Sequence, residues 1–265
     1  NNTPEQILAA IKQADTVAIT LHRSPDGDSL GSSQSLAYVI QRELGKKVII
    51  VSPDALPGFI EPFVYHDIAF GKTLDDVEAD VYIMPDCGSW TKEALTKEFT
   101  EGSLISIDHH DSNDGYGHLN YVQPQVSSAC SVVFDLVKEW GFTFDKELAM
   151  RLIIGMFTDT GGFKFGKSLA KDIEKLGFLL NNTDVDYAND ILVHLTKFSY
   201  SSKKLWGIVL YNLEKQGDFG ISCISLAEMQ KYEIDPKEVR GGIAAIRDIT
   251  ELSVVCTLTE LEDGS

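Results

Sequence analysis

The chain contains 265 residues, of which 43% are hydrophobic, and it carries a formal net charge of -17 at pH 7. This length and composition suit one large domain or two smaller ones, whereas the negative charge disfavours a long electrostatic track for duplex or extended single-stranded nucleic acid. No run approaches the roughly 18 apolar residues of a membrane span, and the start NNTPEQ lacks the features of a secretion signal, so we expect a globular, cytoplasmic protein.

The first fifth of the chain alternates between helical and extended patterns. The expected elements are a helix at 5–14, a strand at 16–21, a helix at 31–44 and a strand at 47–52. Gly45 closes the second helix. Together these segments form a strand, helix, strand unit of the kind that builds parallel sheets.

The sequence LHRSPDGDSLGS places an imidazole and two carboxylates directly after the first strand. His22, Asp26 and Asp28 lie close together in the sequence, and Pro25 and Gly27 disfavour a helix across them. We therefore expect a non-helical loop that folds around a metal ion. An Asp-Gly-Asp sequence alone is most often a simple turn, so this interpretation depends on ligands from elsewhere in the chain.

Two later strands also end on acidic residues. The expected elements are a strand at 80–86 that ends at Asp86, a helix at 91–99, and a strand at 103–108 that leads into Asp108, His109 and His110. Taken alone, Asp86 could merely cap a helix and the His-His pair could be a surface turn. Strands that alternate with helices, however, predict an α/β fold with a mostly parallel sheet and flanking helices. Ligands bind such sheets outside the carboxyl ends of the strands, where all three acidic segments fall.

Helical patterns dominate the middle of the chain, and a smaller unit follows. The expected helices are 127–140, capped by Ser127 and Ser128, then 146–158, 169–180, 185–194 and 201–213. Strands are expected at 217–225 and 252–258, around a helical segment at 238–246. We therefore predict a catalytic domain at 1–195, a linker helix at 196–216 and a smaller α/β domain at 217–265. This last domain looks truncated, because the chain stops shortly after a strand.

The acidic clusters suit two divalent cations. Carboxylates and imidazoles without thiolates favour Mn²⁺, with Mg²⁺ or Co²⁺ as alternatives. We assign His22 and Asp26 to one cation, Asp28, His109 and Asp159 to the other, and Asp86 as the bridge between them. Two cations about 3.5 to 4 Å apart can clamp both oxygens of an in-line displacement at phosphorus and lower the pKa of a bound water, which then supplies hydroxide as the nucleophile.

Other residues near these clusters receive separate roles. Together with Asp86, we assign catalytic roles to His110, which contacts the scissile phosphate or protonates the leaving alcohol, and to Asp108, which orients the neighbouring imidazoles. Phe163 and Phe165 in the segment TDTGGFKF could stack a nucleobase, but apolar packing is the expected role of both.

Four motifs in order, HRSPDGDSLGS, MPDCGS, DHH and FTDTGG, resemble those of the DHH phosphoesterase family. This resemblance implies a metal site formed by the same residues: His22, Asp26, Asp28, Asp86, His109 and Asp159. The length and the S-P-D-G-D form are most similar to the bifunctional members, which degrade very short oligoribonucleotides and dephosphorylate 3′-phosphoadenosine 5′-phosphate. Family members also carry a basic C-terminal segment and a GGGH-type motif, neither of which is visible here. Arg247 is a weak candidate to replace the phosphate contact that this missing segment would provide.

These features predict a Mn²⁺-dependent hydrolase of the phosphodiesterase or exoribonuclease type. It would cut short oligonucleotides or dinucleotides to mononucleotides, or remove the 3′-phosphate of 3′-phosphoadenosine 5′-phosphate. One alternative is a manganese inorganic pyrophosphatase, and another is a non-catalytic nucleotide-binding module. The expected partners are short oligonucleotides or nucleotides, not long duplexes or membranes, and a homodimer is compatible with the sequence.

Overall fold

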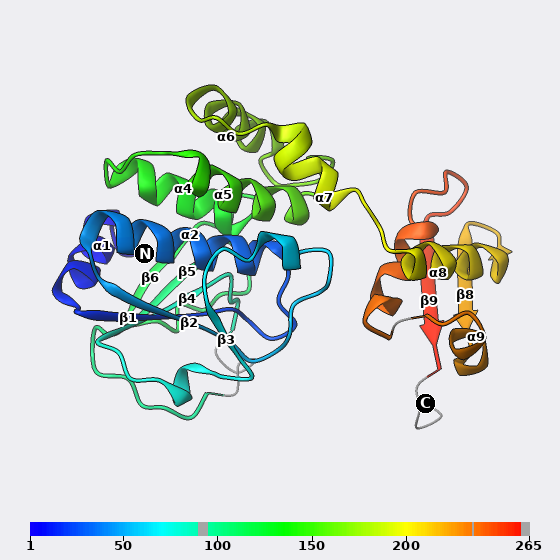
Figure 1. The fold of residues 1–265 in the computed structure, drawn as a ribbon, viewed down its shortest axis with the longest axis horizontal. Helices are drawn as coiled ribbons and strands as arrows, with labels where there is room; N and C mark the ends of the chain where they lie inside the picture. Colours follow the sequence, from blue (N-terminus) through cyan, green and yellow to red (C-terminus); the bar gives the residue numbers. More distant parts are fainter. Residues whose placement is uncertain (90–94, 235, 261–265) are drawn as a thin grey trace. The chain divides into compact units, whose positions relative to one another are not determined.

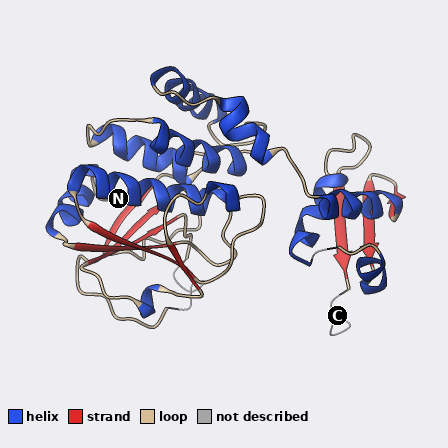
Figure 2. Ribbon diagram, viewed as in Figure 1, coloured by secondary structure: helices blue, strands red, loops and turns tan. Residues whose placement is uncertain are grey.

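The computed structural model describes residues 1–89, 95–234 and 236–260. The chain forms two compact units, one built from Asn1–Leu56 and Ile60–His194 and the other from Pro57–Phe59 and Leu195–Ser265. Figure 1 traces the chain, and Figure 2 distinguishes its helices and strands. None of the helices in the described part of the chain has the length and apolar character needed to cross a membrane.

A six-stranded parallel sheet forms the centre of the first unit. Its strands are β1 (Thr16–Thr20), β2 (Lys47–Ser52), β3 (Ile68–Phe70), β4 (Val81–Pro85), β5 (Leu104–Asp108) and β6 (Leu119–Val122). They lie in the order β3-β2-β1-β4-β5-β6, and every pairing is parallel. The strand order reverses between β1 and β4, and ligands bind open α/β sheets at such a point. The predicted α/β fold with a mostly parallel sheet is confirmed.

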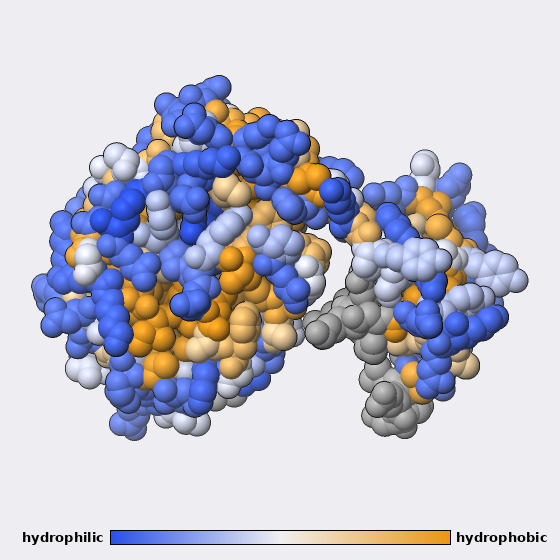
Figure 3. Space-filling model, viewed as in Figure 1, coloured by the Kyte–Doolittle hydropathy of each residue, from blue (hydrophilic) through white to orange (hydrophobic). Residues whose placement is uncertain are grey.

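Helices cover one face of this sheet. The helical elements of the unit are α1 (Pro4–Gln13), α2 (Gly27–Leu44), α4 (Ala129–Glu139), α5 (Lys146–Asp159), α6 (Leu169–Asn182), the π-helical turn η3 (Tyr187–Leu192) and α7 (Val193–Leu195). Two 3₁₀ turns, η1 (Glu61–Phe63) and η2 (Leu74–Asp76), lie in the connections. Helices α2 and α4 pack on the sheet, and α5 packs against both of them (Figure 1). In Figure 3, most side chains on the outer surface of these helices are polar. This is expected when the apolar sides of the helices face the core.

Helix α2 corrects one prediction about the first acidic cluster. It begins at Gly27 and not at residue 31, because the Asp26 side chain accepts hydrogen bonds from the backbone N–H groups of Asp28 and Ser29, both at 3.0 Å. An N-cap of this kind satisfies backbone donors that have no partner inside the helix. The expectation of a non-helical loop is therefore wrong for Asp28, which lies in the first turn of α2.

Sequence patterns missed the shortest elements. Strands β3 and β6 were not predicted; both lie at the edges of the sheet, and with 3 and 4 residues they are too short to show a clear pattern. Part of the helix predicted at 91–99 lies outside the described residues, and residues 95–100 have no regular secondary structure. The remaining predicted helices and strands of this unit are present, with small shifts at their ends.

The second unit combines a small sheet with short helices. Its elements are α8 (Tyr200–Tyr211), β7 (Leu213–Gln216), β8 (Phe219–Ile224), α9 (Leu226–Lys231), the 3₁₀ segment η4 (Pro236–Ala245) and β9 (Val254–Thr259). Strand β8 pairs antiparallel with β7 and parallel with β9. The helix predicted as a linker packs in this unit's core, where Leu205 and Val209 join Ile224 and Ile246. The domain boundaries at 1–195, 196–216 and 217–265 stay a prediction.

Candidate metal centre

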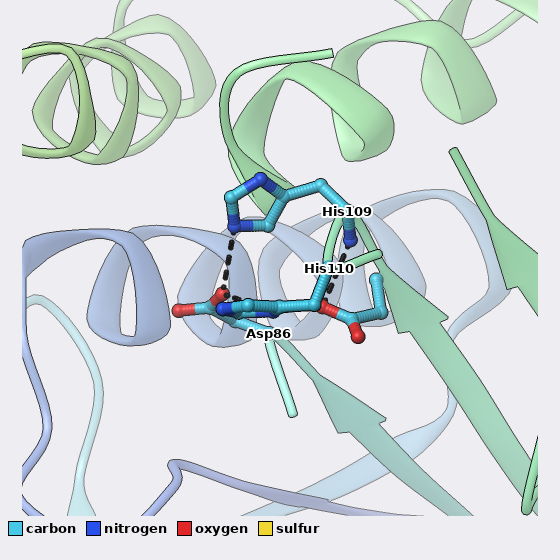
Figure 4. Close-up of side chains that lie close together, drawn as sticks. Asp86, His109 and His110 are labelled. Atoms are coloured by element: carbon cyan, nitrogen blue, oxygen red, sulfur yellow. Dashed lines mark hydrogen bonds and ion pairs between the residues drawn. The ribbon is translucent and has the colours of Figure 1, made fainter. Parts of the chain in front are cut away.

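The six residues predicted as metal ligands lie together at the carboxyl ends of the central strands. His22 follows β1, Asp26 caps α2, Asp28 lies in its first turn, Asp86 follows β4, His109 follows β5 and Asp159 ends α5. Because β1 and β4 are the neighbours at which the strand order reverses, both halves of the sheet deliver residues to one place. Figure 4 shows the side chains of His109 and His110 both close to the carboxylate of Asp86.

The first ligand group consists of His22, Asp26 and Asp86. Nε2 of His22 lies 3.3 Å from Oδ2 of Asp86 and 3.8 Å from Oδ1 of Asp26. The other ring nitrogen, Nδ1, lies 2.8 Å from the carbonyl oxygen of Arg23 and donates to it, because a carbonyl can only accept. This hydrogen bond orients the ring so that Nε2 faces the two carboxylates.

The second ligand group consists of Asp28, His109 and Asp159. Nε2 of His109 lies 3.5 Å from Oδ2 of Asp159 and 3.8 Å from Oδ2 of Asp28. The same nitrogen lies 3.4 Å from Oδ1 of Asp86. One imidazole nitrogen thus faces three carboxylates that come from two helices and one strand end.

Asp86, a member of the first group, also faces the histidine of the second group. Its Oδ2 faces His22 and its Oδ1 faces His109, so each carboxylate oxygen faces the histidine of a different ligand group. The backbone of Asp86 has φ of +56°, a left-handed conformation that aspartate tolerates better than most residues. This conformation, directly after β4, directs a nearly buried carboxylate to a point between the two imidazoles.

Asp28 is held by backbone groups from a distant helix. Its side chain is fully buried, and it accepts hydrogen bonds from the N–H groups of Ala129 at 2.5 Å and Cys130 at 2.9 Å. These are the first residues of α4, where helix N–H groups have no partner inside the helix and carry partial positive charge. Sequence reasoning missed this contact, because it joins residues about a hundred positions apart.

Asp108 holds the ring of His110. Oδ1 of Asp108 lies 2.7 Å from Nδ1 of His110 and accepts the N–H of His109 at 2.8 Å. Its Oδ2 accepts from Asn113 Nδ2 at 2.7 Å. Burial alone would raise the pKa of Asp108, but the hydrogen bonds with His110 and Asn113 outweigh it and lower that pKa, while the same pairing raises the pKa of His110. Sequence reasoning did not identify Asn113, because the segment 111–117 has only the pattern of a polar loop.

The ligand groups bind protons strongly. Burial alone would lower the pKa of His22, but its hydrogen bonds with Asp26 and Asp86 raise it to about 11. The same competition, with Asp86 as the main partner, raises the pKa of His109 to about 9. Burial is the main cause that raises the pKa of Asp159 to about 7. The site therefore stabilises positive charge.

This donor set fits divalent cations. Burying the carboxylates of Asp28 and Asp86 beside that of Asp159 is costly unless cations or protons compensate their charge. Burial raises the pKa of Asp28 well above its ordinary value. Oxygen and imidazole donors suit Mn²⁺ or Mg²⁺. Cys130 also lies against Asp28, but burial raises the pKa of its thiol well above the usual range, so the thiol stays protonated and adds no thiolate donor.

Binding of Mn²⁺ is expected to release at least two protons per protein at pH 7. His22 and His109, with pKa values of about 11 and 9, both carry a proton in the metal-free site, and this proton must leave before Nε2 can coordinate a metal. Affinity should fall further below pH 7, where Asp159 also becomes protonated. Calorimetric titration in two buffers of different ionisation enthalpy measures the released protons, and identical heats in both buffers would contradict the expectation.

Arg247, predicted to contact substrate, belongs to the second unit. Its Nε lies 3.5 Å from Oδ1 of the neighbouring Asp248. A role of Arg247 at the metal residues stays a prediction.

Comparison with known proteins decides the family. The sequence model of the family described as "DHH family, N-terminal domain" matches residues 16–156 of this chain. The match covers more than half of the chain and includes five of the six candidate ligands. The chain belongs to the DHH family. The resemblance seen in the sequence is thereby confirmed, and the sixth candidate ligand, Asp159, lies just beyond the matched range.

Several relatives of this DHH-family chain carry the names of hydrolases. A probable bifunctional oligoribonuclease and PAP phosphatase NrnA from Streptococcus mutans is 28% identical over 97% of this chain and 82% of its own length. A probable manganese-dependent inorganic pyrophosphatase from Streptococcus agalactiae is 24% identical over 91% of this chain and 73% of its own length. A solved exopolyphosphatase-related protein from Bacteroides fragilis has a TM-score of 0.85 at 25% identity, and the match covers 98% of this chain and 80% of that one. The prediction of a hydrolase is confirmed at this level.

Proposed function

We propose that this DHH-family chain is a two-metal hydrolase of short nucleotides. It cuts dinucleotides and very short oligonucleotides to mononucleotides and removes the 3′-phosphate of 3′-phosphoadenosine 5′-phosphate. The observation that carries the proposal is Asp86, whose two oxygens lie 3.3 Å from His22 Nε2 and 3.4 Å from His109 Nε2. A carboxylate shared between two ligand groups is the arrangement that holds paired cations for in-line displacement at phosphorus.

The name of the Streptococcus mutans relative supports a nucleotide substrate. That protein matches this chain at higher identity and over more of its length than the pyrophosphatase does. The net charge of -17 agrees with substrates that are too short to require a long basic track. A homodimer and the exclusion of long duplexes remain predictions.

The candidate ligands divide into two sets. His22 and Asp26 would hold one cation, Asp28, His109 and Asp159 the other, and Asp86 would contact both. When bound, the cations supply Lewis-acid activation of water and phosphate. Mn²⁺ fits these donors best, and Mg²⁺ or Co²⁺ are alternatives.

His110 is the residue that we assign to the substrate. Its side chain is 43% exposed, whereas that of Asp108 is fully buried. Asp108 raises the pKa of His110 and so favours the protonated imidazole, the form that can donate to a phosphate oxygen or to the leaving alcohol. Asp108 acts as a positioning residue, since it fixes the ring without reaching the substrate.

An activity panel tests the proposal. The purified protein is stripped with a chelator, reloaded with Mn²⁺, Mg²⁺ or Co²⁺, and incubated with a dinucleotide, 3′-phosphoadenosine 5′-phosphate, a cyclic dinucleotide or pyrophosphate. We expect Mn²⁺ to restore the release of mononucleotides from the dinucleotide. Pyrophosphate hydrolysis without dinucleotide cleavage would replace the proposal with a pyrophosphatase. Dinucleotide binding without product over hours would instead indicate a binding module.

A further inference from the structure

The side chain of Asn113, in the loop that follows the DHH triplet, contacts two of the segments that form the site. Its Nδ2 donates to Oδ2 of Asp108 at 2.7 Å and to the carbonyl oxygen of Cys87, the residue after Asp86, at 3.2 Å. The same nitrogen lies 3.1 Å from Oγ of Ser106 on β5. One amide group thus connects the end of β4, which carries Asp86, with the end of β5, which carries the triplet.

The orientation of this amide follows from its partners. Oδ1 of Asn113 accepts the backbone N–H of Gly115 at 2.8 Å, and a backbone N–H can only donate. The carbonyl of Cys87 can only accept, so the other side of the amide must present Nδ2. The side chain therefore has two separate functions: its oxygen closes the loop at Gly115, and its nitrogen holds groups of the site.

The contact between Nδ2 and Asp108 has the largest expected effect. A hydrogen bond to a carboxylate is charge-assisted and about twice as strong as one between neutral groups. The carbonyl of Cys87 would keep a second donor without Asn113, because it also accepts from the hydroxyl of Tyr116 at 2.9 Å. Loss of the amide should therefore disturb Asp108 more than the segment that carries Asp86.

Asp108 transmits this contact to His110. Its other oxygen, Oδ1, accepts a hydrogen bond from Nδ1 of His110, 2.7 Å away, so a shift of the carboxylate shifts the ring. Gly88 lies against the same side chain, where an added Cβ would come within 3.2 Å of His110 Cβ and Cγ. The partly exposed imidazole is thus held between a hydrogen bond and a close backbone contact, and its direction depends on where Asp108 is held.

We propose that Asn113 is a positioning residue for the reaction, because it holds Asp108 in place and thereby directs His110 toward the substrate. The inference rests on the proposed nucleotide hydrolase and adds to it a residue that acts through another. Supporting contacts of this kind contribute about 10- to 100-fold in activity. Residues that act through one network are not additive, so Asn113 and His110 should behave as one unit.

Asn113→Asp isolates the donor. At pH 8 the new carboxylate keeps an oxygen for the N–H of Gly115 but has no N–H for Asp108. We expect kcat for a dinucleotide to fall about 10- to 100-fold in both Asn113→Asp and Asn113→Ala, with the number of bound Mn²⁺ ions unchanged. Adding Asn113→Ala to His110→Ala should cause no further loss. The melting temperature of each variant verifies its fold.

Asn120→Ala is the matched control. It removes an amide that holds the same loop at Gly117, through hydrogen bonds of 3.0 and 2.6 Å, instead of at Asp108, and kcat should stay normal. Full activity in Asn113→Asp, or equal losses in Asn113→Ala and Asn120→Ala, would show that Asn113 only shapes the loop. A further loss when Asn113→Ala is added to His110→Ala would equally overturn the inference.

NMR of the histidine rings in the metal-free protein tests the positioning without turnover. His110 of the unchanged protein should carry a proton on Nδ1 that Asp108 protects from exchange with solvent, and both Asn113 variants should lose this protection. The signal is assigned by its absence in His110→Ala. Identical His110 signals in the unchanged protein and both variants would overturn the inference. Absence of turnover by the unchanged protein would defeat the proposed hydrolase, while the NMR comparison still decides whether Asn113 positions His110.

Discussion

Replacing Asp86 with alanine is expected to reduce Mn²⁺-dependent hydrolysis by about a thousandfold or more, the scale on which single preorganised electrostatic contacts act in catalysis. Asp86 faces both His22 and His109, so its loss affects both ligand groups at once. Removing a ligand that belongs to one group, such as Asp26, should leave the other group intact. We therefore expect Asp86→Ala to lose affinity for both cations, measured as the number of Mn²⁺ ions retained after gel filtration.

Two further variants isolate the carboxylate of Asp86. Asp86→Asn keeps the size of the side chain and tolerates the left-handed backbone at φ of +56°, so it removes the negative charge with little change in strain. It should be almost as inactive as Asp86→Ala. Asp114→Ala removes an exposed aspartate from the loop after the DHH triplet and should retain full activity. Normal turnover by Asp86→Ala would disprove the shared-ligand assignment.

Gly155→Ala is expected to damage the metal centre without removing any ligand. A Cβ at this position of α5 would lie 2.2 Å from Cys130 Sγ and 2.5 Å from Asp28 Oδ1. Either α5 moves away from its neighbours, or Asp28 leaves the N–H groups of α4. We expect a loss of about 1 to 3 kcal/mol in the free energy of unfolding and about 10- to 100-fold weaker Mn²⁺ binding, as when a ligand loses its supporting contacts.

Gly177→Ala is the matched control for this variant. Gly177 also lies inside a helix, α6, but an added Cβ would meet no atom within 4 Å. Since alanine favours helix by up to about 1 kcal/mol over glycine, this variant should be at least as stable as the unchanged protein and bind Mn²⁺ normally. Urea denaturation and Mn²⁺ calorimetry measure both quantities. Unchanged metal affinity in Gly155→Ala would show that the close approach to Asp28 has no functional role.

Much of the first unit was predictable from local patterns. Apolar runs identified β1, β2, β4 and β5, and helical spacing identified α2, α4 and α5, because side-chain periodicity depends on neighbouring residues alone. Since parallel strands deliver their carboxyl ends to one edge, the same patterns also predicted that His22, Asp86 and His109 would meet. The start of α2 was wrong because the side-chain cap at Asp26 outweighed the loop tendency of Pro25 and Gly27.

By itself, the sequence determined which residues stand at the ends of the strands, and therefore which of them were candidates for a metal site. Only the tertiary structure decided how those residues face one another: Asp86 presents one oxygen to each ligand group, and α4 supplies the N–H groups that hold Asp28. It also decided that Phe163 packs inward while Phe165 stays exposed. Such contacts join segments far apart in the chain, so they depend on how the sheet and helices pack together and not on any local pattern of residues.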